Sequence, residues 1–142
     1  MRALWFALLV LLGAPLYAEE APPLLVMTDV WPPFRMQVAD GELQGLDIDL
    51  LNQLSARTGL RFEVLRAPWA RGLAALQNGK ADLMTGLAKT PEREAYIDYL
   101  AQPYYACAPR FYAAPTQAKV LHSYTQLAGL TIGHVLESAY FE

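Results

Sequence analysis

Cysteine and histidine are scarce in this chain of 142 residues, which has one cysteine, Cys107, and two histidines, His122 and His134. A single cysteine excludes an internal disulfide, so a packed core must stabilise the fold, and we expect Cys107 to be a small buried residue. Neither histidine forms a nucleophile-and-base pattern with a serine, cysteine or carboxylate pair near it, so each is expected to be a surface or core histidine. No metal-ligand spacing is present either. These absences argue against metal sites and against nucleophilic catalysis.

Clusters of positive charge and long apolar runs are also missing. The net charge is −3 and lysine and arginine do not cluster, which argues against a nucleic-acid partner. The apolar run over residues 3–12 is shorter than the roughly twenty residues that span a membrane. It follows Arg2 and ends before Gly13 and Pro15, as in a secretory signal. We expect a signal peptide over residues 1–18, cleaved near Ala18, and a soluble protein in the Gram-negative periplasm.

The middle of the chain alternates between two hydrophobic periods. Strands are predicted over residues 24–28, 61–65 and 82–87. Between them two helices are predicted, one with an apolar stripe from Leu46 to Leu54 and one with helical spacing from Trp69 to Leu76 that ends in Asn78-Gly79. The first helix has a leucine stripe, two aspartates in its favourable first turn and a glycine after its end, formed by Leu46, Leu50, Leu51, Leu54, Asp47, Asp49 and Gly59. Strand, helix, strand, helix, strand predicts an α/β fold with a parallel sheet. Ligands of such sheets bind beyond the carboxyl ends of the strands.

A helix is predicted from Pro91 to about Leu100, and its first turn contains an arginine. Thr90 is a good N-cap, Pro91 suits the first helical position, and Arg93 falls at the third. A cation is disfavoured at the positive end of a helix dipole unless an anion joins it, so this turn suggests a site for a carboxylate or phosphate. The alternative is a solvated Arg93 paired with a neighbouring acid, for which Glu92, Glu94 and Asp98 are the candidates.

Six short motifs resemble those of family 3 solute-binding proteins in their order and spacing. They are residues 28–34 (TDVWPPF), 45–50 (GLDIDL), 76–83 (LQNGKADL), 90–93 (TPER), 97–99 (IDY) and 103–105 (PYY). The resemblance implies a periplasmic receptor for polar amino acids that serves an ABC importer. Its fold would be of the periplasmic-binding-protein type II, with two α/β lobes that close on the ligand.

The resemblance also implies a division of the chain. Residues 19–114 would form the first lobe, with a strand-like stretch over residues 109–114, and residues 115–126 the hinge. Residues 127–142 would begin the second lobe with a turn and a strand. Because members of this family usually exceed 200 residues, we expect most of the second lobe to be missing from this sequence. No cofactor is implied, and the expected partners are a carboxylate ligand and the importer's permease subunits, with the receptor itself a monomer.

Residues of the ligand site follow from the same resemblance. Arg93 matches the arginine that clamps the ligand's α-carboxylate, and Thr90 with the backbone amides near Gly86 and Ala88 would complete that anion site. Asp29 would bind the ligand's amine, and two indoles and one hydroxyl complete the set, from Trp31, Trp69 and Ser138. The alternatives are structural: Asp29 capping a turn, Trp69 anchoring the core, Gly86 serving only a tight strand exit, and Phe34, a further candidate, packing under the loop.

Three departures from the family pattern leave the ligand class open. Ala88 stands where many amino-acid binders have Ser or Thr, so only its backbone amide could serve. Glu137 adds a carboxylate beside Ser138 that would crowd an anionic ligand, and Arg71 either reaches a second acidic group or is solvated on its helix. Two other functions share this fold, a periplasmic dehydratase and the sensory domain of a membrane histidine kinase. A kinase would continue into an apolar span, and a dehydratase would need a positioned acid or base.

Overall fold

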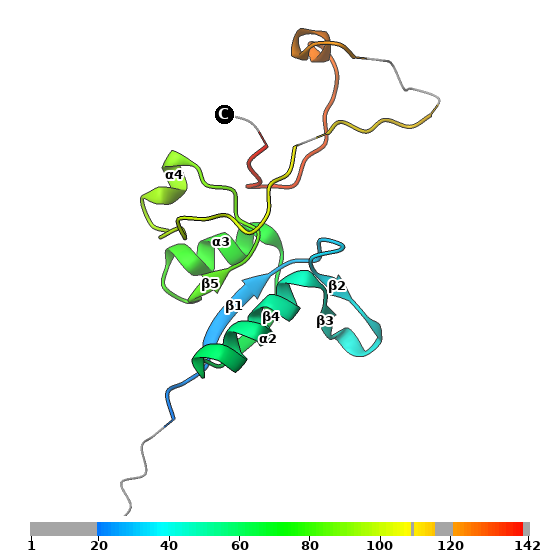
Figure 1. Cartoon of the computed structure of the whole chain (residues 1–142). Helices are drawn as coiled ribbons and strands as arrows, with labels where there is room; N and C mark the ends of the chain where they lie inside the picture. The colour runs from blue at the N-terminus through cyan, green and yellow to red at the C-terminus, as the bar shows by residue number, and fades with distance from the viewer. Residues whose placement is uncertain (1–19, 109, 116–120, 141–142) are drawn as a thin grey trace, which may run out of the picture.

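The predicted alternation of strands and helices is confirmed by the computed structural model, which describes residues 20–108, 110–115 and 121–140. Strands β1 (Leu24–Thr28), β4 (Phe62–Arg66) and β5 (Leu83–Met84) form a parallel sheet in the order β4-β1-β5. Helix α2 (Leu46–Thr58) connects β1 to β4, and α3 (Trp69–Gln77) connects β4 to β5 (Figure 1). The predicted signal peptide lies outside the described residues.

The core is centred on β1, the middle strand. Val26 has no exposed surface and lies in register with Val64 of β4 and Leu83 of β5. Parallel crossovers are right-handed, and the two connections move in opposite directions along the sheet, which places α2 and α3 on opposite faces. Figure 1 shows α2 in front of the strands, while α3 packs against β1 and β5. The carboxyl ends of all three strands therefore meet at one edge, where the predicted ligand residues lie.

A small antiparallel hairpin precedes α2 and was not predicted. Strands β2 (Met36–Gln37) and β3 (Leu43–Gln44) pair across the 3₁₀ turn η1 (Ala39–Gly41). Asp-Gly is a typical turn sequence, and Gly41 has a φ of 84°. Strands of two residues are too short to produce a readable alternation.

Helix α2 has the predicted glycine cap, but its buried face differs from the leucine stripe. Gly59 takes the left-handed C-cap conformation with a φ of 74°. Leu46 and Leu54 are exposed, whereas Asp47 and Leu51 are the buried residues of the helix. The buried face differs because Asp47, expected only as a favourable first-turn acid, forms an ion pair with Arg35 inside the lobe.

Two elements at the site edge are shorter than predicted. Strand β5 has two residues where residues 82–87 were expected, because Gly86 takes a φ of 71° and turns the chain out of the sheet. The helix expected from Pro91 to Leu100 is α4 (Pro91–Glu94), a single turn. The hydroxyl of Tyr99 donates to the Ala88 carbonyl at 3.0 Å, so a tertiary contact rather than a helical ladder fixes the chain after α4.

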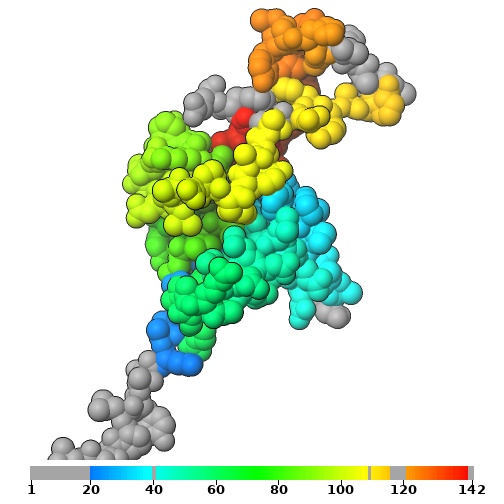
Figure 2. Space-filling view, viewed as in Figure 1, coloured from blue at the N-terminus to red at the C-terminus, as the bar shows by residue number. Residues whose placement is uncertain are grey.

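Residues 110–115 and 121–133 extend away from the lobe as an arm (Figures 1 and 2). The strands expected over residues 109–114 and near residue 131 do not form in its described part, which contains only the 3₁₀ turn η2 (Tyr124–Leu127). A strand requires a neighbour to satisfy its backbone groups, and the arm has left the sheet. For the same reason Cys107, just before the arm, is exposed rather than buried, and that expectation was wrong.

The chain returns to the lobe at its described C-terminal end. Residues 134–140 form a turn closed by the Ser138 amide, which donates to the Val135 carbonyl at 3.1 Å. Glu137 within this turn has a φ of 61° and contacts the lobe through its carbonyl. The longest described helix, α2, has 13 residues, and none of the described helices has both the length and the apolar character that crossing a membrane requires.

Candidate functional site

Arg93 is the most buried of the predicted ligand residues, with 7% of its surface exposed. Its Nη1 donates to the Ala88 carbonyl at 2.9 Å, and its Nη2 donates to the Glu137 carbonyl. Among the described residues no carboxylate lies within ion-pair distance of it. The proposed alternative partner Glu94 instead forms a 2.7 Å ion pair with Lys89. A buried guanidinium thus has only neutral acceptors in the described part of the chain.

The turn that holds Arg93 is capped as the sequence predicts. Thr90 is the N-cap, and its hydroxyl accepts a hydrogen bond from the Arg93 amide at 3.4 Å. Backbone hydrogen bonding at Glu92, together with the Thr90 side chain, lowers the pKa of the Glu92 carboxyl. Because α4 has one turn, its dipole is small and adds little to an anion site. The evidence for anion binding is therefore the buried guanidinium rather than the helix end.

Trp69 meets Arg93 through a shared acceptor. The Trp69 indole Nε1 donates to the Glu137 carbonyl at 3.3 Å, the same oxygen that accepts from Arg93. Trp69 begins α3 and is half-buried. Ser138 follows Glu137 and is half-buried beside this contact. The structure thus brings Arg93, Trp69 and the turn of Ser138 together, although they are far apart in sequence.

Ala88 contributes its carbonyl where the sequence suggested its amide. That carbonyl accepts hydrogen bonds from Arg93 Nη1 and from the Tyr99 hydroxyl. Burial raises the pKa of the Tyr99 hydroxyl, which the Arg93 charge partly opposes. The loop between β5 and α4 therefore orients the guanidinium through its backbone oxygen.

Trp31 heads a second, aromatic cluster at the end of β1. Its ring stacks on Phe34 with centroids 4.9 Å apart, and Tyr105 contacts Phe34 edge-on at 4.4 Å. Phe34 is 6% exposed, so it packs under the loop, whereas Trp31 is 38% exposed. Tyr105 belongs to the PYY motif, so the chain segment of residues 103–105 also contributes to this cluster. Trp31 and Tyr105, which is 49% exposed, are thus the members of the cluster that a ligand could reach.

The Asp29 carboxylate contacts the backbone amide of the next residue and faces a cation. Its Oδ1 accepts from the Val30 amide at 2.8 Å and lies 3.6 Å from Nε of Arg66 at the end of β4. A pocket of about 270 Å³ lies here, lined by Asp29, Arg66, Ala67 and Pro68. Asp29 thus lies in the wall of a pocket that ends at Pro68, the residue before Trp69.

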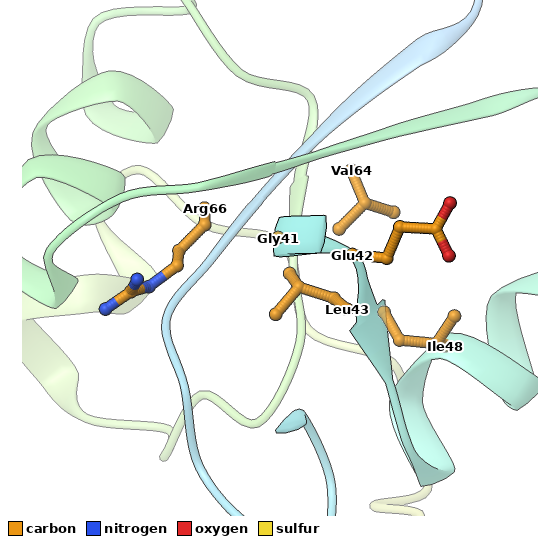
Figure 3. Close-up of a pocket in the computed structure, with 6 residues that line it drawn as sticks. All are labelled: Gly41, Glu42, Leu43, Ile48, Val64 and Arg66. Atoms are coloured by element: carbon orange, nitrogen blue, oxygen red, sulfur yellow. The ribbon is translucent and has the colours of Figure 1, made fainter. Parts of the chain in front are cut away.

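A second pocket of about 270 Å³ contains none of the predicted ligand residues. Figure 3 shows Leu43, Ile48 and Val64 around it, with the charged ends of Glu42 and Arg66 directed away on either side. An apolar hollow whose charged rim faces outward offers no partner to a carboxylate. We therefore place the candidate site at the strand ends rather than in this hollow.

Arg35 and Asp47 form a buried ion pair that sequence reasoning missed. Their side chains are 2% and 0% exposed, and the pair joins the loop after β1 to the start of α2. Nη1 of Arg35 also donates to the Thr85 hydroxyl at 2.9 Å. The Tyr104 hydroxyl donates to the other oxygen of Asp47 at 2.9 Å; burial, with this contact, raises the pKa of Tyr104 to about 12. Because the pair is twelve residues apart and follows no periodic pattern, no sequence signal identified it.

Other chemistry has little support in the described residues. His122 and His134 are exposed and lie in the arm and in the returning turn. No three histidine, cysteine or acidic side chains within the described ranges gather closely enough to hold a metal ion. Arg71 is exposed on α3, as expected for the solvated alternative.

Comparisons of the sequence with known families and proteins point to one group. Residues 24–128 match the family described as bacterial extracellular solute-binding proteins, family 3. The "probable histidine-binding protein" of Neisseria gonorrhoeae is 32% identical over 74 residues, 51% of this chain and 27% of that protein. The "L-arginine-binding protein" of Pseudomonas aeruginosa is 27% identical over 101 residues, 70% of this chain and 39% of that protein.

Solved structures give the same result. An ancestral arginine-binding protein bound to glutamine matches with a TM-score of 0.54 and 31% identity, over 61% of this chain and 39% of that one. The same kind of protein bound to arginine has a TM-score of 0.51 and 32% identity, over 56% and 36% of the two chains. The chain therefore spans between about a quarter and two fifths of these relatives, all of which carry the names of binding proteins.

Proposed function

The chain belongs to the bacterial extracellular solute-binding proteins of family 3, and from that premise we propose that it supplies the first lobe of a receptor for a small carboxylate ligand, an amino acid. The receptor would work in the periplasm after removal of residues 1–18 and would deliver its ligand to an ABC importer. Binding would involve no covalent chemistry.

The observation that carries this proposal is the state of Arg93. Arg93 is 7% exposed and has lost most of its hydration, and in the described part of the chain its guanidinium donates to the neutral carbonyls of Ala88 and Glu137. A carboxylate adds an attraction between opposite charges and can accept two parallel N–H bonds from one guanidinium, neither of which a neutral carbonyl offers. A ligand carboxylate would therefore be a better partner for Nη2 than the neutral carbonyl of Glu137.

Replacement of the Glu137 carbonyl by a ligand carboxylate at Arg93 would provide a binding mechanism. The ligand carboxylate would take the place of the Glu137 carbonyl beside Arg93 and Trp69, while Nη1 stays on Ala88 and keeps the guanidinium oriented. The turn of Ser138 would then move to enclose the ligand from the other side. Burial between two surfaces supplies most of the affinity in sites of this kind.

The body of the ligand would lie toward the ends of β1 and β4. Trp31 offers an exposed ring, and Asp29 offers a carboxylate for the ligand's amine. Relatives are named for arginine and histidine, and one solved relative contains glutamine. These three amino acids are the first probes for this chain.

The test is a thermal-shift and calorimetric screen of L-arginine, L-histidine and L-glutamine against the chain at neutral pH. The proposal predicts that at least one raises the melting temperature and that Arg93→Ala abolishes the shift. Arg57→Ala is the matched control, because it removes an equal charge from the exposed end of α2 and should leave the shift intact. A ligand that stabilises Arg93→Ala and the unmodified chain equally would refute the proposed clamp.

A further inference from the structure

Arg35 lies beneath the candidate site and holds three segments of the lobe at once. Its Nε donates to the Asp29 carbonyl at 2.9 Å, at the end of β1. Its Nη1 donates to the Thr85 carbonyl at 3.2 Å and to the Thr85 hydroxyl at 2.9 Å, where β5 ends. The same nitrogen pairs with Asp47 in the first turn of α2. One side chain therefore ties the exits of two sheet strands to a helix.

Two residues predicted for the ligand site, Trp31 and Gly86, lie directly against this guanidinium. The Arg35 Cζ lies 5.3 Å from the centroid of the Trp31 ring, a distance typical of a cation–π contact. A Cβ placed on Gly86 would lie 2.8 Å from Arg35 Nη1 and 3.2 Å from Trp31 Cζ3. Trp31, Gly86 and Arg35 are thus in close contact with no space for one methyl group between them.

Arg35 and Arg93 differ in whether an acidic side chain balances their charge. Arg35 is 2% exposed and its charge is balanced by Asp47, so it can neither reach a ligand nor attract one. Arg93 is also buried but lacks such a partner among the described residues. The structure therefore contains one neutralised arginine under the site and one unneutralised arginine beside it.

Stability alone does not require this pair. A buried ion pair often contributes no more than well-packed apolar residues of similar volume, because burying both charges costs as much as their attraction returns. An apolar pair could fill the same space, but it could not donate to the Asp29 carbonyl or hold the carbonyl and hydroxyl of Thr85. What Arg35 provides, and an apolar pair could not, is a set of hydrogen bonds that fix the positions of these backbone segments.

We propose that Arg35 is a positioning residue for the ligand site: its guanidinium fixes the Trp31 ring and the Thr85–Gly86 backbone without touching the ligand. This inference rests on the proposed function, since it assigns Trp31 and Gly86 to that site. It predicts that changes at Arg35 alter ligand affinity through Trp31 and the β5 exit even where the fold is preserved.

The experiment replaces the ion pair with an apolar pair, Arg35→Met with Asp47→Leu, in the full chain. Melting temperature is measured with L-arginine, L-histidine and L-glutamine affinities, and 5-fluorotryptophan ¹⁹F spectra assigned through Trp→Phe variants report on each indole. We expect the variant to fold with a lowered melting temperature, because the Asp29 and Thr85 acceptors and the Tyr104 hydroxyl lose their partners. The Trp31 resonance should shift and broaden while Trp69 keeps its resonance, and affinity should fall roughly tenfold.

Controls keep the outcome decisive. Arg61→Met removes an exposed arginine paired with Glu20 and should change neither resonance. If the double variant does not fold, Arg35→Lys retains the charge beside Asp47 but lacks the fork, and the same Trp31 change is expected. An unchanged Trp31 resonance in a folded variant overturns the proposal. If the unmodified chain binds none of the three amino acids, the proposed function fails, while the Trp31 resonance still decides whether Arg35 positions the ring.

Discussion

Gly86→Ala tests the close packing at the exit of β5, because alanine adds one methyl group at the most crowded point of the site. Gly86 has a φ of 71°, in the left-handed region, and its added Cβ would lie 2.8 Å from Arg35 Nη1. That nitrogen cannot withdraw freely, since it is hydrogen-bonded to Thr85 and paired with Asp47. The substitution therefore combines backbone strain with the loss of a buried contact.

The two contributions can be separated with a second glycine. The left-handed conformation costs alanine about 1 kcal/mol. Displacing Arg35 from a charged hydrogen bond costs about 2 kcal/mol more, giving a total near 3 kcal/mol for Gly86→Ala. Gly79 has a φ of 64°, but no atom lies within 4 Å of its added Cβ. Gly79→Ala should therefore cost only the backbone contribution of about 1 kcal/mol.

Urea unfolding at 25 °C, followed by tryptophan fluorescence, measures both free energies on the same chain. The expected difference between the two variants is about 2 kcal/mol, well above the error of the method. Equal destabilisation of Gly86→Ala and Gly79→Ala, within about 0.5 kcal/mol, would show that Arg35 yields without cost and would refute the argument from close packing.

Three further predictions concern the contacts around this site. Tyr104→Phe should cost about 1 kcal/mol at pH 9; because the folded pKa of Tyr104 is raised to about 12, this contribution is present below pH 10 and is lost as the pH rises to about 12, so urea unfolding of the two proteins should converge over that range. Thr90→Ala should speed hydrogen exchange at the Arg93 amide roughly fivefold, since it removes an N-cap worth about 1 kcal/mol, and an unchanged rate would mean that the cap is not formed in solution. Arg66→Ala should raise the affinity for L-arginine relative to L-glutamine by freeing Asp29, and an unchanged ratio in calorimetry would exclude Asp29 from contact with a cationic side chain.

Local patterns predicted the strands and helices of the lobe because each carries its own physical signal. The apolar run of β1, the glycine at the end of α2 and the helical spacing after Trp69 are readable within a few residues. The predictions that failed depend on distant contacts. Helix α4 stops at Glu94 and Tyr99 bonds to Ala88, and the arm forms no strand in its described part because no sheet lies beside it.

The candidate site shows the same difference between local features, which the sequence predicts, and distant contacts, which it does not. Thr90 was recognised as the N-cap of the turn that holds Arg93, because capping follows from adjacent residues in one turn. The Arg35–Asp47 pair and the carbonyl of Glu137 were not, since the first joins two segments without a repeat and the second is a backbone atom 44 positions from Arg93. A backbone acceptor leaves no trace in side-chain identity, so only coordinates could locate it.

Comparison of an amino acid with its amide tests the central claim, that Arg93 recognises the ligand's carboxylate. Calorimetry would measure the affinity of the unmodified chain and of Arg93→Ala for L-arginine and for L-argininamide, which lacks the carboxylate charge. The account predicts that the unmodified chain prefers L-arginine by about tenfold or more, the worth of a charged hydrogen bond, and that this preference disappears in Arg93→Ala. A preference of equal size in both proteins would contradict it.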